Sequence, residues 1–222
     1  MDLNPIRLAG RVLRKAGYEL LRHQGMEGVW IDVGAHHGEQ TLGSASHNPG
    51  LRIYAFEPNL RPAAKMMGHA RNFVVIPMAV SETNGCADFH VNAFDMSSSL
   101  LPTNEEALRT WVGVEALKVE SVVTVPTIRL DTFMHLMGIK SVDFLKIDTQ
   151  GGDLAVLRSA GSRLSDIAKI KLEVEVAPVH YYVGAPSKDE VVEFLVDAGF
   201  ALVEVESQTH GQEENLTFVR KR

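Results

Sequence analysis

Short apolar runs rich in β-branched and aromatic residues alternate along this chain with segments of helical periodicity, and this alternation limits the fold more than any other feature. Strands that alternate with helices are typical of a parallel sheet covered by helices on both faces. The sequence therefore predicts an α/β fold. The expected strands of the main sheet cover residues 29–33, 51–56, 73–80, 142–147, 167–176, 200–206 and 215–219.

The helices are expected between these strands. One follows Gly38, one begins near Asp153, and others cover residues 61–70, 130–137 and 188–198. The last two strands are separated only by the short polar segment 207–214, so we expect them to form an antiparallel hairpin that ends the sheet.

Residues 85–127 interrupt this rhythm. Strands are expected at 86–91 and 122–127, as a hairpin or an excursion from the sheet, with a polar stretch between them that is too long for a simple connection. Insertions of this kind often carry function. The expected organisation is an N-terminal helix within residues 1–25 and one main domain over 26–222, with an insert at about 85–127.

The N-terminal segment suits an amphipathic helix over about residues 3–23. Its basic residues are Arg7, Arg11, Arg14, Lys15 and Arg22, with apolar residues between them. We favour a packing helix with a solvated basic face. The alternative is a helix that binds a membrane surface or an acidic partner.

Composition excludes several classes of protein. The single cysteine, Cys86, rules out an intramolecular disulfide and a cysteine-rich zinc site. No apolar run approaches the length of about 18 residues that a membrane span needs, so no stable membrane insertion is expected. The formal net charge of −6 argues against a nucleic-acid partner. The N-terminus does not have the pattern of a signal peptide, so a cytoplasmic protein is expected.

A glycine-bearing turn follows the first strand, in the run Asp32-Val-Gly34-Ala-His36-His-Gly38. Glycines here allow a tight strand-to-helix turn and the close approach of a ligand to the backbone. The run does not match the dinucleotide pattern G-x-G-x-x-G, so a loop that holds a smaller nucleoside is favoured over a pyrophosphate loop. A purely structural turn remains the alternative.

Two further carboxylates end strands of the same sheet. Glu57 ends the second strand, where a carboxylate can accept hydrogen bonds from both hydroxyls of a ribose. A favourable charge at a helix N-terminus is the alternative. Asp148 ends the strand at 142–147, and Lys146 on this strand could form a buried ion pair with Glu173 or Asp143. We expect Asp32, Glu57 and Asp148 to converge along one rim of the sheet.

Taken together, these residues resemble a known family. The runs DVGAHHG, AFEPN, AVSETNG, SSSLL, FLKIDTQGGDLAVL and LEVEV, and the tail GF…NLTFV, are similar in order to those of the FkbM-type S-adenosylmethionine-dependent methyltransferases. The resemblance covers roughly residues 29–220. It implies a class I methyltransferase, Rossmann-like fold, with a seven-stranded, mostly parallel sheet, an antiparallel last strand and helices on both faces. It also implies O-methylation of a hydroxyl, often on a sugar, a polyketide or another secondary metabolite.

The resemblance implies roles for individual residues. The methionine end of S-adenosylmethionine is expected at Asp32, Gly34, His36 and Gly38, the ribose at Glu57, the adenine at Pro58, Asn59, Ala79, Val80 and Ser81, and the reactive methyl at Asp148 and Gln150. Two positions depart from the family pattern. His36 stands where the family usually has Asn, and Gly152-Asp153 replaces the usual Ala-Glu.

Methylation of a neutral hydroxyl gains from a general base. Asp148 is the first candidate, and Glu173 and Glu175 on the next strand are the second. His180 is a further catalytic candidate. The substrate is expected to contact Ser98, Gln150, Glu173 and Tyr181. No metal is expected, because the chain has no HxH or HExxH spacing. The alternative is a divalent ion such as Mg²⁺ held by the oxygen ligands of Asp148 and Glu175.

The sequence therefore predicts a cytoplasmic S-adenosylmethionine-dependent O-methyltransferase that acts on a hydroxyl of a small molecule or glycan. Homo-oligomerisation is left open. One alternative is a nucleotide-sugar or dinucleotide-dependent oxidoreductase, which the incomplete glycine pattern disfavours. The other is a non-catalytic binding protein with a methyltransferase fold, against which the intact Asp32, Glu57 and Asp148 argue.

Overall fold

The structure is a computed structural model that describes residues 27–107 and 117–221. The helix expected over residues 3–23 lies outside the described residues, as does part of the inserted segment. Of the helices in the described ranges, none has the length and apolar character needed to cross a bilayer.

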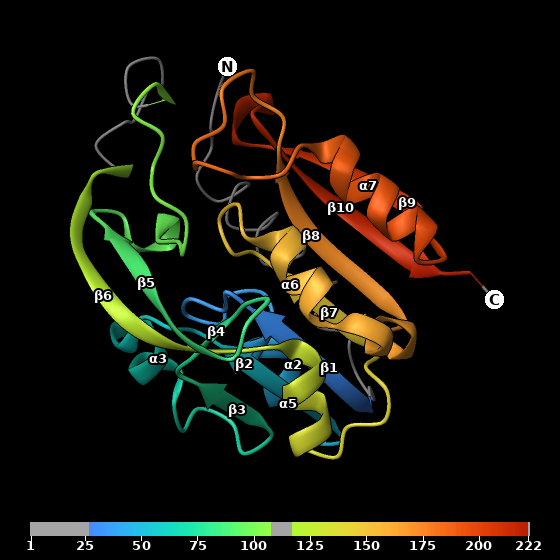
Figure 1. Cartoon of the computed structure of the whole chain (residues 1–222). Coiled ribbons are helices and arrows are strands. Elements are labelled where there is room, and N and C mark those ends of the chain that lie inside the picture. The colour runs from blue at the N-terminus through green and yellow to red at the C-terminus, as the bar shows by residue number, and fades with distance from the viewer. Residues whose placement is uncertain (1–26, 108–116, 222) are drawn as a thin grey trace, which may run out of the picture.

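A seven-stranded sheet forms the centre of the molecule (Figure 1). Its strand order is β3-β2-β1-β7-β8-β10-β9, and the first five strands of this order are parallel. β10 runs antiparallel to both β8 and β9, so the predicted hairpin ends the sheet. The strands are β1 Gly28–Val33, β2 Leu51–Phe56, β3 Phe73–Ile76, β7 Phe144–Ile147, β8 Lys169–Glu175, β9 Phe200–Gln208 and β10 Glu213–Arg220. The predicted fold class is confirmed.

Helices cover the two faces of the sheet, and the strands are therefore buried on both sides. Along β1, Trp30 belongs to one apolar cluster and Ile31 and Val33 to another, as strand alternation requires. The larger cluster packs against α5, α6 and α7, and the smaller one against α2 and α3. The helices are α2 Leu42–His47, α3 Leu60–Met66, α5 Leu130–Leu136, α6 Asp153–Ser159 and α7 Lys188–Asp197, with short 3₁₀ turns η1 Asp95–Ser97, η3 Gly161–Asp166 and η4 Thr209–Gly211.

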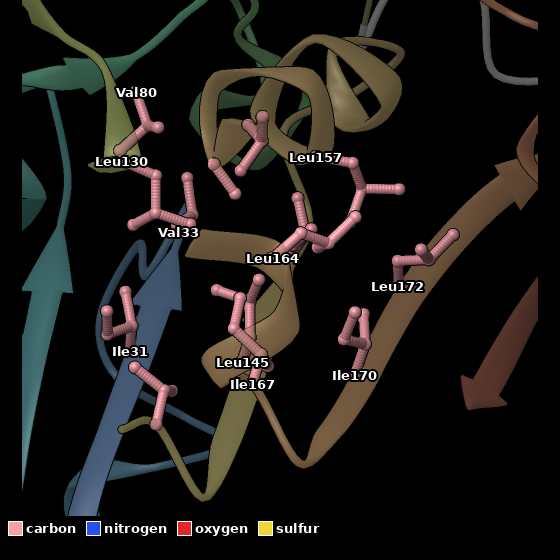
Figure 2. Packing of buried hydrophobic residues seen from close by; sticks show 14 of the residues in the cluster. Ile31, Val33, Val80, Leu130, Leu145, Leu157, Leu164, Ile167, Ile170 and Leu172 are labelled. Carbon is pink, nitrogen blue, oxygen red and sulfur yellow. The ribbon is translucent and has the colours of Figure 1, made fainter. Parts of the chain in front are cut away.

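The larger cluster joins the centre of the sheet to the helices above it. Figure 2 shows Leu145 of β7 and Ile170 and Leu172 of β8 beneath Leu157 of α6. All four side chains are fully buried. This packing fixes the height of α6 over the sheet, and with it the turn between β7 and α6 that carries part of the site.

A second sheet stands beside the first, with the order β4-β6-β5. Its strands are β4 Ala79–Val80, β5 Gly85–Asn92 and β6 Val119–Ile128, and β5 and β6 pair antiparallel. The single strand predicted over 73–80 is wrong. It divides at Pro77, which has no N–H to donate to a continuing ladder, so β3 ends in the main sheet and β4 joins the second one.

Candidate active site

A cavity of about 500 Å³ lies where the carboxyl ends of β1, β2, β7 and β8 meet the inserted segment. This is the edge at which ligands bind in open α/β sheets, beside the point where the strand order reverses. The strands run outward from β1 to β3 and then return to β7 on the other side of β1. Of the residues singled out in the sequence, those lining the cavity are Gly34, His36, Glu57, Pro58, Ala79, Val80, Ser81, Ser98, Lys146, Asp148, Gln150, Gly152, Glu173 and Tyr181.

Gly34 forms the floor of the cavity between β1 and β7. Its φ is +74°, and a Cβ at this position would lie 1.8 Å from the carbonyl oxygen of Asp148. The backbone N–H groups of Gly34 and Ala35 both donate to the carbonyl oxygen of Phe56, at 3.0 Å. Only glycine allows this approach, which brings the ends of three strands together. Gly38 lies deeper, and a Cβ there would meet Leu42, Met66 and Phe73.

Lys146 lies at the same turn as a buried cation and lines the cavity. Its Nζ donates to the carbonyl oxygen of Gly34 at 2.6 Å and lies 3.1 Å from Asp32 Oδ1 and 3.6 Å from Asp148 Oδ2. Burial lowers the pKa of Lys146, but the charges of Asp32 and Asp148 outweigh burial and raise that pKa above its ordinary value. Lys146 is therefore charged at neutral pH.

These contacts correct two sequence-based expectations. Lys146 pairs with neither Glu173 nor Asp143 among its described ion pairs, because the parallel register places it directly beside Asp32. The Asp32 carboxylate does not line the cavity. It is 1% exposed and accepts a hydrogen bond from the Thr41 hydroxyl at the start of α2, so it holds the loop below the cavity.

Glu57 lies in the cavity wall at the end of β2 and is 6% exposed. Its Oε2 accepts the His36 N–H and its Oε1 accepts the Asn59 N–H, both at 2.8 Å. Burial raises the pKa of Glu57, although these two hydrogen bonds oppose the shift. A carboxylate oxygen accepts at two positions, so each oxygen retains capacity for one more donor. The Asn59 side chain caps α3 by accepting the Arg61 N–H and lies outside the cavity lining.

Gln150 joins three parts of the site. Its φ is +57°, and its Nε2 donates to Asp148 Oδ1 at 2.9 Å and to Glu173 Oε2 at 3.3 Å. The Tyr182 hydroxyl lies 3.0 Å from Gln150 Oε1 and 2.6 Å from the Ser97 carbonyl oxygen. This network fixes the direction of the Asp148 carboxylate. Tyr182 is a site residue that the sequence analysis overlooked, although it directly follows Tyr181.

The part of the cavity near Asp148 is rich in carboxylates. Glu173 lines it, and burial, then the charges of Asp148 and Glu213, raises the pKa of Glu173 to about 9. Glu213 at the start of β10 also lines the cavity, and burial raises its pKa. Nothing in the sequence marks Glu213, because it reaches the site only through the pairing of β10 with β8. Next to the cavity, burial followed by the charge of Asp148 raises the pKa of Asp153 to about 7.

Glu175 and His180 lie beside the cavity, outside its lining. Glu175 Oε2 accepts the Tyr181 N–H at 2.7 Å and lies 3.3 Å from His180 Nδ1. Burial raises the pKa of Glu175 to about 7. Both residues therefore hold the loop that places Tyr181 in the wall, whereas Asp148 is itself part of the wall.

The inserted segment supplies the apolar wall. Its lining residues are Phe89, Phe94, Met96, Leu100, Leu101 and Leu117. Phe94 and Met96 keep about half of their surface exposed, at 51% and 48%. Ser98 lines the cavity between them and the polar end, and its hydroxyl accepts the Asn92 N–H. The segment thus forms a real side of the cavity, as expected for an insertion that carries function.

The strand order, the glycine turn after β1 and the carboxylate at the end of β2 define a class I methyltransferase fold. M. capricolum TrmK, solved with its cofactor product S-adenosyl-homocysteine, has this fold and superposes with a TM-score of 0.50. It is 9% identical, with 92% of this chain and 67% of that chain covered. The magnesium protoporphyrin IX methyltransferase of Synechocystis PCC 6803 gives a TM-score of 0.49 at 13% identity, covering 100% of this chain and 86% of that one.

A family model described as the methyltransferase FkbM domain matches residues 32–202, so the chain belongs to the FkbM methyltransferase family. The resemblance seen in the sequence is confirmed, and S-adenosylmethionine is the cofactor of this class. A curated relative, 2-O-methyltransferase NoeI of Sinorhizobium fredii (strain NBRC 101917 / NGR234), is 27% identical over 148 residues, which cover 62% of this chain. The match spans 59% of that relative's length.

Proposed function

We propose that the protein transfers the methyl group of S-adenosylmethionine to a hydroxyl of a small molecule or glycan. The observation that carries the proposal is one cavity that both Glu57 and Asp148 line. The name of the relative NoeI, a 2-O-methyltransferase, favours a hydroxyl acceptor.

The surroundings of Glu57 fit a nucleoside. Glu57 has two acceptor positions left, which suit the two hydroxyls of a ribose. Pro58, Ala79, Val80 and Ser81 would enclose the adenine, and the Gly34 turn would hold the methionine portion. The cavity volume of about 500 Å³ lies within the range of ordinary small-molecule sites. When bound, S-adenosylmethionine supplies an activated methyl group on a sulfonium.

Asp148 would accept the proton of the acceptor hydroxyl. Lys146 lies 3.6 Å from its Oδ2, and Gln150 donates to its Oδ1, so both neighbours hold the carboxylate in one orientation. Glu173 is the weaker candidate for this role, because its pKa of about 9 keeps it protonated at neutral pH. A protonated Glu173 can instead donate a hydrogen bond that orients the acceptor.

The proposal is tested by titrating S-adenosylhomocysteine into the wild type and into Glu57→Gln. A hydrogen bond to a charged group contributes about 1.5–3 kcal/mol, so the variant should bind at least about tenfold more weakly. Glu82→Gln is the matched control, since Glu82 is an exposed partner of Arg158 and should bind as the wild type does. Thermal unfolding of each variant verifies that the fold is retained.

Transfer itself is tested by incubation with S-adenosylmethionine and a panel of hydroxylated acceptors, followed by mass spectrometry of the products. A methylated hydroxyl supports the proposal. Binding of S-adenosylhomocysteine without transfer to any acceptor would favour the non-catalytic alternative. Binding of a nicotinamide dinucleotide in its place would favour the oxidoreductase alternative.

A further inference from the structure

Two adjacent histidines meet a carboxylate of the inserted segment at the rim of the cavity. His36 and His37 lie in the loop after β1, and Asp95 opens η1. One ligand atom from each of these three residues lies within 4.8 Å of the other two. We propose that His36, His37 and Asp95 form a binding site for a divalent transition-metal ion, with zinc as its occupant.

The surroundings of His36 match those of a metal-binding histidine. Its Nδ1 lies 2.8 Å from Glu39 Oε1, and its Nε2 lies 3.0 Å from Asp95 Oδ1. Histidines that bind metals usually donate their second N–H to a carboxylate, which fixes the tautomer and the orientation of the ring. Glu39 is itself held in place, because its Oε2 accepts the His37 N–H at 3.1 Å. Glu39 therefore orients His36 and leaves Nε2 directed at Asp95.

His37 provides an independent observation. Its Nδ1 is buried and has no hydrogen-bond partner among the described residues. A buried polar atom without a partner costs about 1–3 kcal/mol. The ring lies 3.9 Å from the His36 ring, centroid to centroid, and one of its nitrogens belongs to the cluster. A metal ion bound to Nδ1 would satisfy an atom that the described residues leave unpaired.

The donor set selects the class of metal. Two imidazoles and one carboxylate suit zinc and related transition metals, whereas Mg²⁺ and Ca²⁺ prefer oxygen ligands throughout. Three protein ligands leave a tetrahedral ion one open position. His36 and Asp95 also line the cavity, so this position is accessible to a water or to an oxygen of a bound molecule.

The site would link parts of the chain that are far apart in sequence. His36 and Asp95 are separated by 59 positions, which is why no metal-binding spacing is visible in the sequence. The ion would tie η1 of the inserted segment to the loop after β1. It would thereby hold the apolar wall of the cavity against the sheet.

The experiment is a calorimetric titration of the full chain with zinc chloride, after removal of metals with a chelator. One ion per chain is expected to bind. His37→Ala and Asp95→Asn should each weaken binding at least tenfold, and Asp95→Asn keeps the size of the side chain. His135→Ala is the matched control, because His135 is exposed on α5 away from the cluster, and this variant should bind as the wild type does.

Substitution of cobalt(II) gives a second readout. A site with two nitrogen ligands and one carboxylate should produce the visible absorption of tetrahedral cobalt in the wild type and in His135→Ala, but not in His37→Ala. Circular dichroism verifies that the variants fold. The proposal is overturned if zinc binding does not saturate, if His37→Ala and Asp95→Asn bind as tightly as the wild type, or if magnesium binds more tightly than zinc. Neither readout requires methyl donor or acceptor, so failure here leaves the proposed methyl transfer untouched.

Discussion

Lys146 Nζ lies 3.1 Å from Asp32 Oδ1, and both side chains are almost completely buried where β7 and β1 meet the cavity. The two residues are register partners on β7 and β1. The same ammonium donates to the Gly34 carbonyl oxygen at the turn. One buried cation therefore joins the two central strands to the loop that forms the cavity floor.

The first prediction concerns this ion pair. Lys146→Met should lower the free energy of unfolding by about 3–5 kcal/mol, because it leaves the Asp32 charge buried without its cation. Lys171→Met is the control. Lys171 pairs with Glu206 in a partly exposed position, and such pairs contribute at most about 1 kcal/mol. Urea denaturation measures both differences.

The double variant Asp32→Asn/Lys146→Met separates the loss of the charge pair from the loss of packing. Removing both charges should recover part of the stability that Lys146→Met loses, since no unpaired charge then remains buried. If Lys146→Met lowers the free energy of unfolding no more than Lys171→Met does, the Lys146–Asp32 pair does not stabilise the turn after β1.

The second prediction concerns the close approach of β1 and β7. Gly34→Ala places a Cβ 1.8 Å from the Asp148 carbonyl oxygen, so the turn must open. Gly68→Ala is a matched control with a similar φ of +82° and no atom within 4 Å of its added Cβ. Gly68→Ala should lower the free energy of unfolding by about 1 kcal/mol because of its positive φ alone. Gly34→Ala should lower it by several kcal/mol more, because of the added clash. Equal costs in thermal denaturation would refute the steric role of Gly34.

The third prediction concerns the general base. Asp148→Asn should lower kcat by about 10²–10⁴-fold while changing S-adenosylhomocysteine affinity little, because the carboxylate acts on the acceptor proton. Glu175→Gln should lower kcat less, since Glu175 lies outside the cavity lining and holds the Tyr181 backbone. Steady-state kinetics measures kcat of the two variants, and calorimetry measures their affinity for S-adenosylhomocysteine. Equal losses of kcat and affinity in Asp148→Asn would indicate a binding role.

Much of the fold could be predicted because it is encoded locally. The alternation of β-rich and helical segments places β1, β2, β7 and β8, and the polar segment between the last strands predicts their hairpin. The prediction of one strand over 73–80 was wrong because the apolar pattern continues across Pro77, whereas the chain passes from one sheet to the other there. Periodicity reports burial, and it does not report which sheet a strand joins.

The position of a residue at the end of a strand was the most direct guide to the site. Glu57 and Asp148 follow that rule and line the cavity. Asp32 obeys the same rule but is buried outside the cavity lining, where it pairs with its register neighbour Lys146. Glu213 and Asp95 reach the cavity through long-range contacts, and single-sequence patterns do not carry that information.

The last prediction concerns stability at alkaline pH. Burial, then the charges of Asp148 and Glu213, raises the pKa of Glu173 from 4.5 to about 9. Between these values the folded chain holds a proton that the unfolded chain has released. The free energy of unfolding therefore falls as pH rises through this window, and the contribution of Glu173 is lost by about pH 9.

Glu173→Gln removes this titration while keeping the shape of the side chain. Its free energy of unfolding should fall less than that of the wild type between about pH 5.5 and about pH 9, by at least about 1.4 kcal/mol, the equivalent of one pKa unit. Glu120→Gln on β6 is the control, because Glu120 is exposed and should show the wild-type profile. Urea denaturation across this range provides the measurement. Identical pH profiles for Glu173→Gln and the wild type would show that Glu173 is not protonated in the folded chain within this range.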